Sequence, residues 1–82
     1  MNTEMKELTD RISAAKKYLT GEMTCLKTQN GGASFSLREI SYHMDSIHEI
    51  ERLGIRKLTD MDFIKINRTL TSVEACMKLS HN

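Results

Sequence analysis

Hydrophobic residues recur along the chain in three stretches, each with the spacing of an amphipathic helix. In the first stretch the apolar positions follow a heptad pattern and are Met5, Leu8, Ile12, Ala15, Leu19 and Leu26. Glu22 is the polar residue in this stripe, and Met23 lies beside it. The spacing predicts a helix over residues 3–29 with one buried face. Asn30-Gly31-Gly32 would end it, because glycine adopts left-handed conformations without steric cost.

The second stretch has the clearest boundaries. Ser36 and Glu39 have the spacing of a capping box, and Phe35 and Ile40 that of a hydrophobic staple. Gly54 stands where a C-terminal glycine belongs. These signals predict a helix over residues 37–53. Its apolar face comprises Leu37, Ile40, Met44, Ile47, Ile50 and Leu53.

The third stretch predicts a helix over residues 60–79, preceded by Thr59, with Asp60 and Asp62 in its first turn. Its stripe is Phe63, Ile66, Leu70, Val73 and Met77, widened by Met61 and Ile64. No segment sustains the period-two alternation of a strand. The sequence therefore predicts a single all-α domain, 1–82. Its three amphipathic helices would form a small antiparallel bundle or an extended helical hairpin. Gly21 costs a helix interior about 1 kcal/mol, which leaves open a break in the first helix.

Charge and composition narrow the function classes. The 12 Lys and Arg residues nearly balance the 11 Asp and Glu residues, so the net charge is +1. A near-neutral chain lacks the basic footprint of a nucleic-acid or anionic-membrane binder. No apolar run approaches the ~20 residues of a membrane span, and the first residues lack the order of a signal peptide. We therefore expect a cytoplasmic protein without a membrane partner. At 82 residues, oligomerisation is a common source of extra stability.

Candidate reactive groups do not assemble into a site. His43 and His48 are five positions apart, so they do not share a helix face, and Glu39 with His43 makes only half a metal site. Cys25 and Cys76 are expected to be free thiols in a reducing cytosol, with a disulfide or redox switch as the alternative. No nucleophile has a base and an orienting group at a suitable spacing. We expect neither an enzyme nor a bound metal or cofactor.

The apolar stripes favour a non-enzymatic protein–protein interaction module, such as a small chaperone or adaptor, that offers an apolar helical face to a helical partner or to a second copy. The heptad stripe of the first helix suits a coiled-coil seam, and five internal methionines suit an adaptable surface. The candidate partner-binding residues are Met5, Leu8, Ile12, Leu19, Met23 and Leu26. Alternatively, the five internal methionines are ordinary core residues.

A small DNA-binding or phage-type transcriptional regulator is the competing function. Its candidate nucleic-acid contacts are Arg52, Arg56, Lys57, Lys65 and Arg68. Asp60 and Asp62 oppose this interpretation, since they would stand where a recognition helix approaches the phosphates.

A long amphipathic helix, the pair Gly31-Gly32 and a second amphipathic helix together resemble the small co-chaperones of type III secretion needle subunits. The matching inner face is Leu37, Ile40, Ile47 and Ile50. A second register places Phe63, Arg68, Val73, Glu74 and Ala75 on the same pattern. The resemblance covers about half of the chain. It implies a cytosolic chaperone that pairs with a helical-repeat co-chaperone and shields an aggregation-prone secreted subunit.

If the first helix is the contact element, replacing Ile12 and Leu19 with Asp should abolish association, because each change puts a charge into an apolar seam. Pull-down and solution mass measurements test this expectation. Unaltered association would exclude the first helix as the contact.

Overall fold

The computed structural model describes residues 3–27 and 35–80 of the chain. In these ranges it consists of α1 (Thr3–Lys27), α2 (Leu37–Leu53), the short 3₁₀ helix η1 (Ile55–Lys57) and α3 (Asp60–Ser80). The predicted all-α class is confirmed, and no strand occurs in the described part. The predicted bounds of α2 agree with the structure, and α3 extends one residue further than predicted. Residues 28–29 and the predicted Asn30-Gly31-Gly32 turn lie outside the described ranges.

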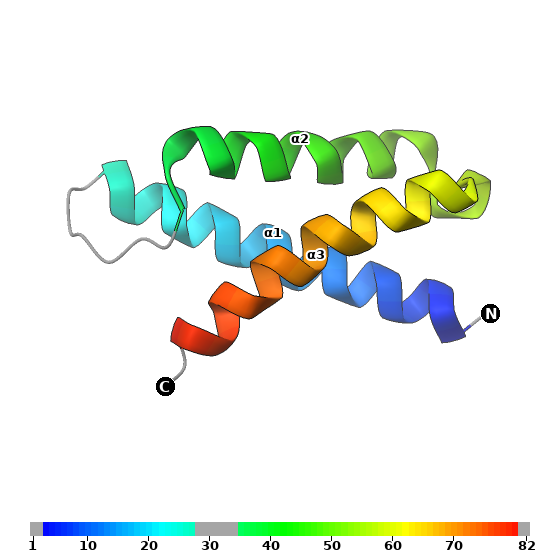
Figure 1. The fold of residues 1–82 in the computed structure, drawn as a ribbon, viewed down its shortest axis with the longest axis horizontal. Helices are drawn as coiled ribbons and strands as arrows, with labels where there is room; N and C mark the ends of the chain where they lie inside the picture. The colour runs from blue at the N-terminus through cyan, green and yellow to red at the C-terminus, as the bar shows by residue number, and fades with distance from the viewer. Residues whose placement is uncertain (1–2, 28–34, 81–82) are drawn as a thin grey trace.

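The three helices pack against one another in a body of 40 × 24 × 17 Å. Figure 1 shows α2 along one side of the molecule, while α1 and α3 cross in this view near their middles and diverge toward their ends. The turn that joins α2 to α3 lies at the same end of the bundle as the N-terminus. The first turns of α1 and the start of α3 therefore lie at the same end of the bundle, on diverging axes, with a groove between them.

Paired hydrogen bonds fix the starts of α2 and α3. The predicted capping box of α2 is present: the Glu39 amide donates to Ser36 Oγ at 3.2 Å, and the Ser36 amide donates to Glu39 Oε1 at 3.0 Å. A second box begins α3, because the Asp62 amide donates to Thr59 Oγ1 at 3.2 Å and the Thr59 amide donates to Asp62 Oδ2 at 3.0 Å. Each box satisfies two amides that a helix start otherwise leaves without partners.

Two glycines behave in opposite ways. α1 continues through Gly21, so the helix is unbroken there. Gly54 ends α2 with φ +89°, and its amide donates to the Ile50 carbonyl at 3.0 Å. That φ lies in a region that residues with a Cβ rarely adopt. Gly54 therefore redirects the chain out of α2 into η1.

One core joins all three helices. α1 contributes Leu8, Ile12, Ala15 and Leu19, α2 with its preceding residue contributes Phe35, Ile40, Ile47 and Ile50, and α3 contributes Ile66, Leu70 and Val73. All of these side chains are less than one tenth exposed. The periodicity in each stretch thus identified the buried face of each helix.

The ends of the predicted stripes do not enter this core. Leu37 and Leu53, the first and last residues of α2, are 52% and 37% exposed. Phe63 is 40% exposed although it has the right phase, and Met61 and Ile64 are more exposed still. Phe63 is exposed because α1 diverges from α3 after the crossing and leaves the first turns of α3 uncovered (Figure 1). Met61 and Ile64 lie off the phase of the buried residues of α3, and Leu37 and Leu53 lie at the two ends of α2.

The buried Glu22 ties the end of α1 to the start of α2. Its Oε1 accepts a 3.0 Å hydrogen bond from the Phe35 amide, and the Tyr18 hydroxyl donates to its Oε2 at 3.3 Å. Only 7% of Glu22 is exposed, so these bonds offset the cost of removing the carboxylate from water. The polar interruption of the heptad stripe is therefore a junction between elements.

The glycines give a matched pair of stability tests. A Cβ at Gly21 would meet nothing within 4 Å, so Gly21→Ala should stabilise the fold by about 1 kcal/mol through helix propensity and raise Tm by roughly 4–8 °C. Gly54→Ala should lower Tm, because alanine is strained at φ +89°. Thermal denaturation followed by circular dichroism measures both. A lower Tm for Gly21→Ala would contradict a continuous α1.

Candidate partner-binding surface

The residues predicted to bind a partner are largely used within the chain itself. Leu8 and Ile12 are 6% and 4% exposed and Leu19 is fully buried, all in the core shared with α2 and α3. Met5 and Met23 are half-buried, and the side chain of Leu26 lies outside the described part. Leu8, Ile12 and Leu19 are therefore core residues of this bundle. Replacing Ile12 or Leu19 with Asp would place an unpaired carboxylate in the core and unfold the chain, so that experiment cannot report on binding.

Exposed apolar side chains gather instead at the end of the bundle that carries the turn between α2 and α3. This apolar end comprises Leu53, Met61, Phe63 and Ile64, which are between 37% and 60% exposed. The other large exposed apolar residues of the described part are Leu37 and Tyr42 in the first two turns of α2 and Leu79 at the end of α3. Single exposed apolar residues are ordinary on a protein surface, whereas a group on one end can mark an interaction site.

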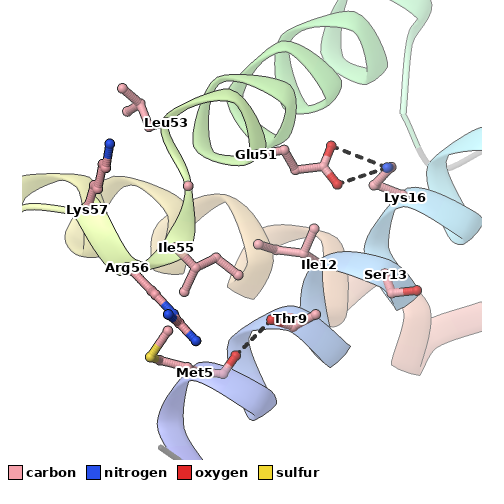
Figure 2. A pocket seen from close by; sticks show the side chains of 11 residues that line it. Met5, Thr9, Ile12, Ser13, Lys16, Glu51, Leu53, Ile55, Arg56 and Lys57 are labelled. Carbon is pink, nitrogen blue, oxygen red and sulfur yellow. Dashed lines mark hydrogen bonds and ion pairs between the residues drawn. The ribbon is translucent and has the colours of Figure 1, made fainter. Parts of the chain in front are cut away.

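Two grooves flank the N-terminal half of α1 at this end. The first has a volume of about 620 Å³ and lies between α1 and the turn after α2 (Figure 2). We call it the basic groove. It is lined by Met5, Thr9, Ile12, Ser13, Lys16, Glu51, Leu53, Gly54, Ile55, Arg56 and Lys57. In Figure 2, Ile12 and Ile55 face one another, Arg56 extends toward Met5, and Lys57 and Leu53 point away from α1.

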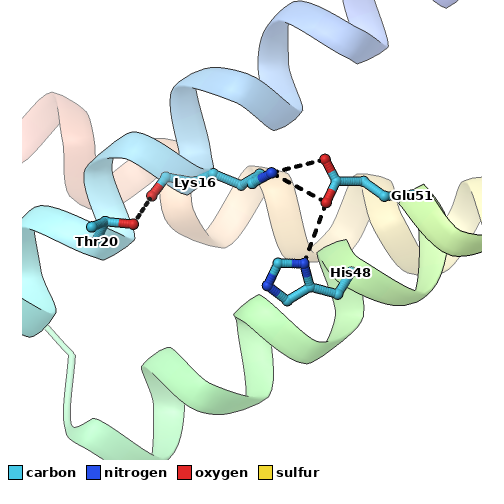
Figure 3. Close-up of polar contacts among 4 residues, drawn as sticks. All are labelled: Lys16, Thr20, His48 and Glu51. Atoms are coloured by element: carbon cyan, nitrogen blue, oxygen red, sulfur yellow. Dashed lines mark hydrogen bonds and ion pairs between the residues drawn. The ribbon is translucent and has the colours of Figure 1, made fainter.

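Ion pairs set the charge of the basic groove. Lys16 Nζ lies 3.2 and 3.0 Å from the two oxygens of Glu51, and His48 Nδ1 lies 3.3 Å from Glu51 Oε1 (Figure 3). The one acidic residue of the groove is thus already paired with a lysine. Arg56 and Lys57 are exposed and pair with no acidic group among the described residues. The rim is therefore positive overall.

The second groove, about 390 Å³, lies between α1 and the start of α3. We call it the acidic groove. It is lined by Glu4, Glu7, Leu8, Arg11, Phe63, Ile64 and Asn67. Its arginine is held by α3: both Arg11–Glu74 contacts measure 2.8 Å, and Arg11 Nη1 donates to Asn67 Oδ1 at 2.9 Å. The bidentate pair raises the pKa of Arg11 and lowers that of Glu74.

The predicted nucleic-acid contacts lie on three elements, α2, η1 and α3, and one of them already has an acidic partner. Arg52 pairs with Glu49 at 2.6 Å. Arg56 and Lys57 lie on η1 beside the basic groove, whereas Lys65 and Arg68 are exposed on α3. Asp60 is exposed at the start of α3, and Asp62 is used in the capping box. Both carboxylates lie in the first turn of α3, as the sequence indicated.

His43 is half-buried, and its Nδ1 has no hydrogen-bond partner among the described residues. Its ring makes edge contacts with Phe35 and Tyr42, at centroid distances of 5.1 and 5.9 Å. Burial lowers the pKa of His43, and the nearby Glu39 carboxylate opposes that shift. Because Glu39 also closes the capping box, this histidine and carboxylate have structural roles.

The described residues contain no cluster of three or more potential metal ligands. The thiol of Cys76 is half-buried on α3. Burial raises the pKa of Cys76, and the carboxylates of Glu22 and Glu39 add to the rise. A thiol with a raised pKa stays protonated at neutral pH, which disfavours nucleophilic chemistry. The side chain of Cys25 lies outside the described part.

Comparison with known proteins adds no assignment: no protein-family model, no curated protein and no solved structure matches this chain. Within the described ranges, no helix combines the length and apolar character needed to cross a membrane. The candidate surface therefore rests on the geometry of this chain alone.

Sequence reasoning identified Met5, Arg56 and Lys57 but assigned them to two competing functions. It did not identify the grooves, because both depend on how α1 diverges from its neighbours after the crossing. One signal was available. Met61 and Ile64 lie off the phase set by Ile66, Leu70 and Val73, and this phase difference indicates apolar residues on an outer face.

The lowered pKa of His43 predicts a dependence of stability on pH. The unfolded state binds this proton more readily than the folded state does. The contribution of His43 to the free energy of unfolding should therefore be at its maximum above about pH 6.5 and should decrease as the pH falls below that value. The lowered pKa values of Glu39, Asp62 and Glu74 act at more acidic pH, below about 4.5. When urea denaturation is measured between pH 5.5 and 7.5, the free energy of unfolding should change less with pH in His43→Gln than in wild type. An equal change with pH in His43→Gln would contradict the assignment.

Proposed function

We propose that this chain is a non-enzymatic interaction module that binds a helix of a partner protein at its apolar end. The observation that carries the proposal is that exposed apolar side chains occur beside both grooves: Leu53 lines the basic groove, Phe63 and Ile64 line the acidic groove, and Met61 lies in the first turn of α3. A partner helix that inserts apolar side chains into a groove is a common mode of recognition.

The energetics favour this end of the bundle over the stripe of α1. Fully burying a large apolar side chain is worth about 1.5–3 kcal/mol. Since roughly half of each side chain at the apolar end is still exposed, covering each one would contribute about 1 kcal/mol. Using the stripe of α1 would first require opening the core.

An adaptor or chaperone in the cytoplasm is the cellular role that fits this module. The resemblance to co-chaperones of needle subunits suggests one class of partner, a helical co-chaperone or an aggregation-prone secreted subunit. Ile40, Ile47 and Ile50, which carry that resemblance, are core residues here. In such a complex the apolar end would therefore make the contact.

The alternative, a DNA-binding regulator, has less support. Arg52 is already paired with Glu49, and Asp60 is exposed in the first turn of α3. Binding to DNA would weaken steeply with salt, because phosphate contacts release counterions. A blank gel shift at low salt would remove this alternative.

Ile64→Glu tests the proposed surface, and Leu79→Glu is its matched control, since Leu79 is 73% exposed near the far end of the same helix. Tagged wild type and both variants would be used to recover partners from the native host at high salt. The recovered protein would then be titrated against each chain by calorimetry. Ile64→Glu should weaken binding at least tenfold, because a carboxylate would be buried in an apolar contact. Leu79→Glu should bind as wild type does.

Circular dichroism must show that both variants remain folded, which their exposed positions favour. Equal affinity of Ile64→Glu and wild type would contradict the proposal. Recovery of nucleic acid instead of protein at low salt would favour the regulator.

A further inference from the structure

The two grooves beside α1 have opposite charges on their rims. Lys16, Arg56 and Lys57 border the basic groove, and Glu4 and Glu7 border the acidic groove. This contrast allows the chemistry of a partner to be assigned to one groove, within the function proposed above. We infer that the basic groove binds an acidic amphipathic helix of a partner protein, with a carboxylate paired to Arg56.

The floor of the basic groove is apolar. Ile12 is almost fully buried beneath it, Ile55 and Met5 are half-buried along it, and Ile12 and Ile55 face one another (Figure 2). Met5 adds an unbranched side chain that adapts to different neighbours. An occupant therefore needs apolar side chains that reach this floor.

The positive charge on the rim of the basic groove favours an acidic occupant. Glu51 is the acidic residue that lines this groove, and both of its oxygens contact Lys16 while His48 contacts one of them. Arg56 extends toward Met5 over the groove, without an acidic partner among the described residues (Figure 2). A guanidinium binds a carboxylate through two parallel hydrogen bonds, so Arg56 can fix the register of an acidic residue.

The groove has the extent of a short helix. Its lining on α1 runs from Met5 to Lys16, which is three turns or about 16 Å. A partner helix of similar length would place apolar residues at i, i+4 and i+7 on the floor, with Glu or Asp beside them.

The test uses two synthetic helical peptides of about 14 residues, enough for nearly four turns. Both carry Leu at i, i+4 and i+7; one has Glu at the flanking positions and the other has Lys. Each is titrated into the full chain carrying labelled Ile and Met methyl groups. The Glu peptide should shift the resonances of Met5, Ile12 and Ile55, and its binding should weaken as salt screens the rim.

Arg56→Glu should lower the affinity of the chain for the Glu peptide at least tenfold. Arg68→Glu is the matched control, because Arg68 is exposed on α3 and does not line the groove; it should change the affinity less than twofold. Both variants alter exposed residues, and dispersed methyl spectra would verify their folds.

Other occupants are outcomes of the same experiment. Equal or tighter binding of the Lys peptide in this groove, or no binding of the Glu peptide, would overturn the inference. Shifts of the same methyl groups on raising the protein concentration alone would assign the groove to a second copy and also overturn it. Shifts confined to Met61 and Ile64 would overturn the inference while the proposed function stands, since that function is tested separately by Ile64→Glu.

Discussion

The structure depends on the burial of one stripe of α1 by two helices at once. Ile12 and Leu19 lie in a core to which both α2 and α3 contribute, and Ala15 between them is fully buried. A small residue at that point lets helix backbones approach closely. Because α1 and α3 cross near their middles (Figure 1), they must diverge beyond that point. The grooves at the apolar end follow from that divergence.

Polar contacts hold this arrangement from both sides of α1. The Arg11–Glu74 pair connects α1 to α3, and the Lys16–Glu51 pair connects α1 to α2. Each pair is about one third exposed, so each contributes only about 0.2–1 kcal/mol. Their larger effect is on geometry. They hold α1 at fixed rotations relative to its neighbours and so determine which side chains border each groove.

Much of the fold could be predicted from local signals. The Ser36–Glu39 box and Gly54 located both ends of α2, because capping chemistry depends on residues close in sequence. The periodicity around Ile66 and Leu70 identified the buried face of α3. Exposure at Phe63 could not be predicted in this way, since its phase is correct and only the path of α1 leaves it uncovered. The position of the basic groove likewise depends on contacts between residues far apart in the sequence, such as Lys16 and Glu51.

The burial of Leu19 between the three helices has a kinetic consequence. A partner that required Leu19 could bind only after the helices separated, so its observed association rate would reach a plateau set by opening of the bundle. A partner that used the grooves would meet a surface already formed, and its rate would rise in proportion to its concentration. Two binding modes that bury similar side chains would thus differ in their dependence on partner concentration.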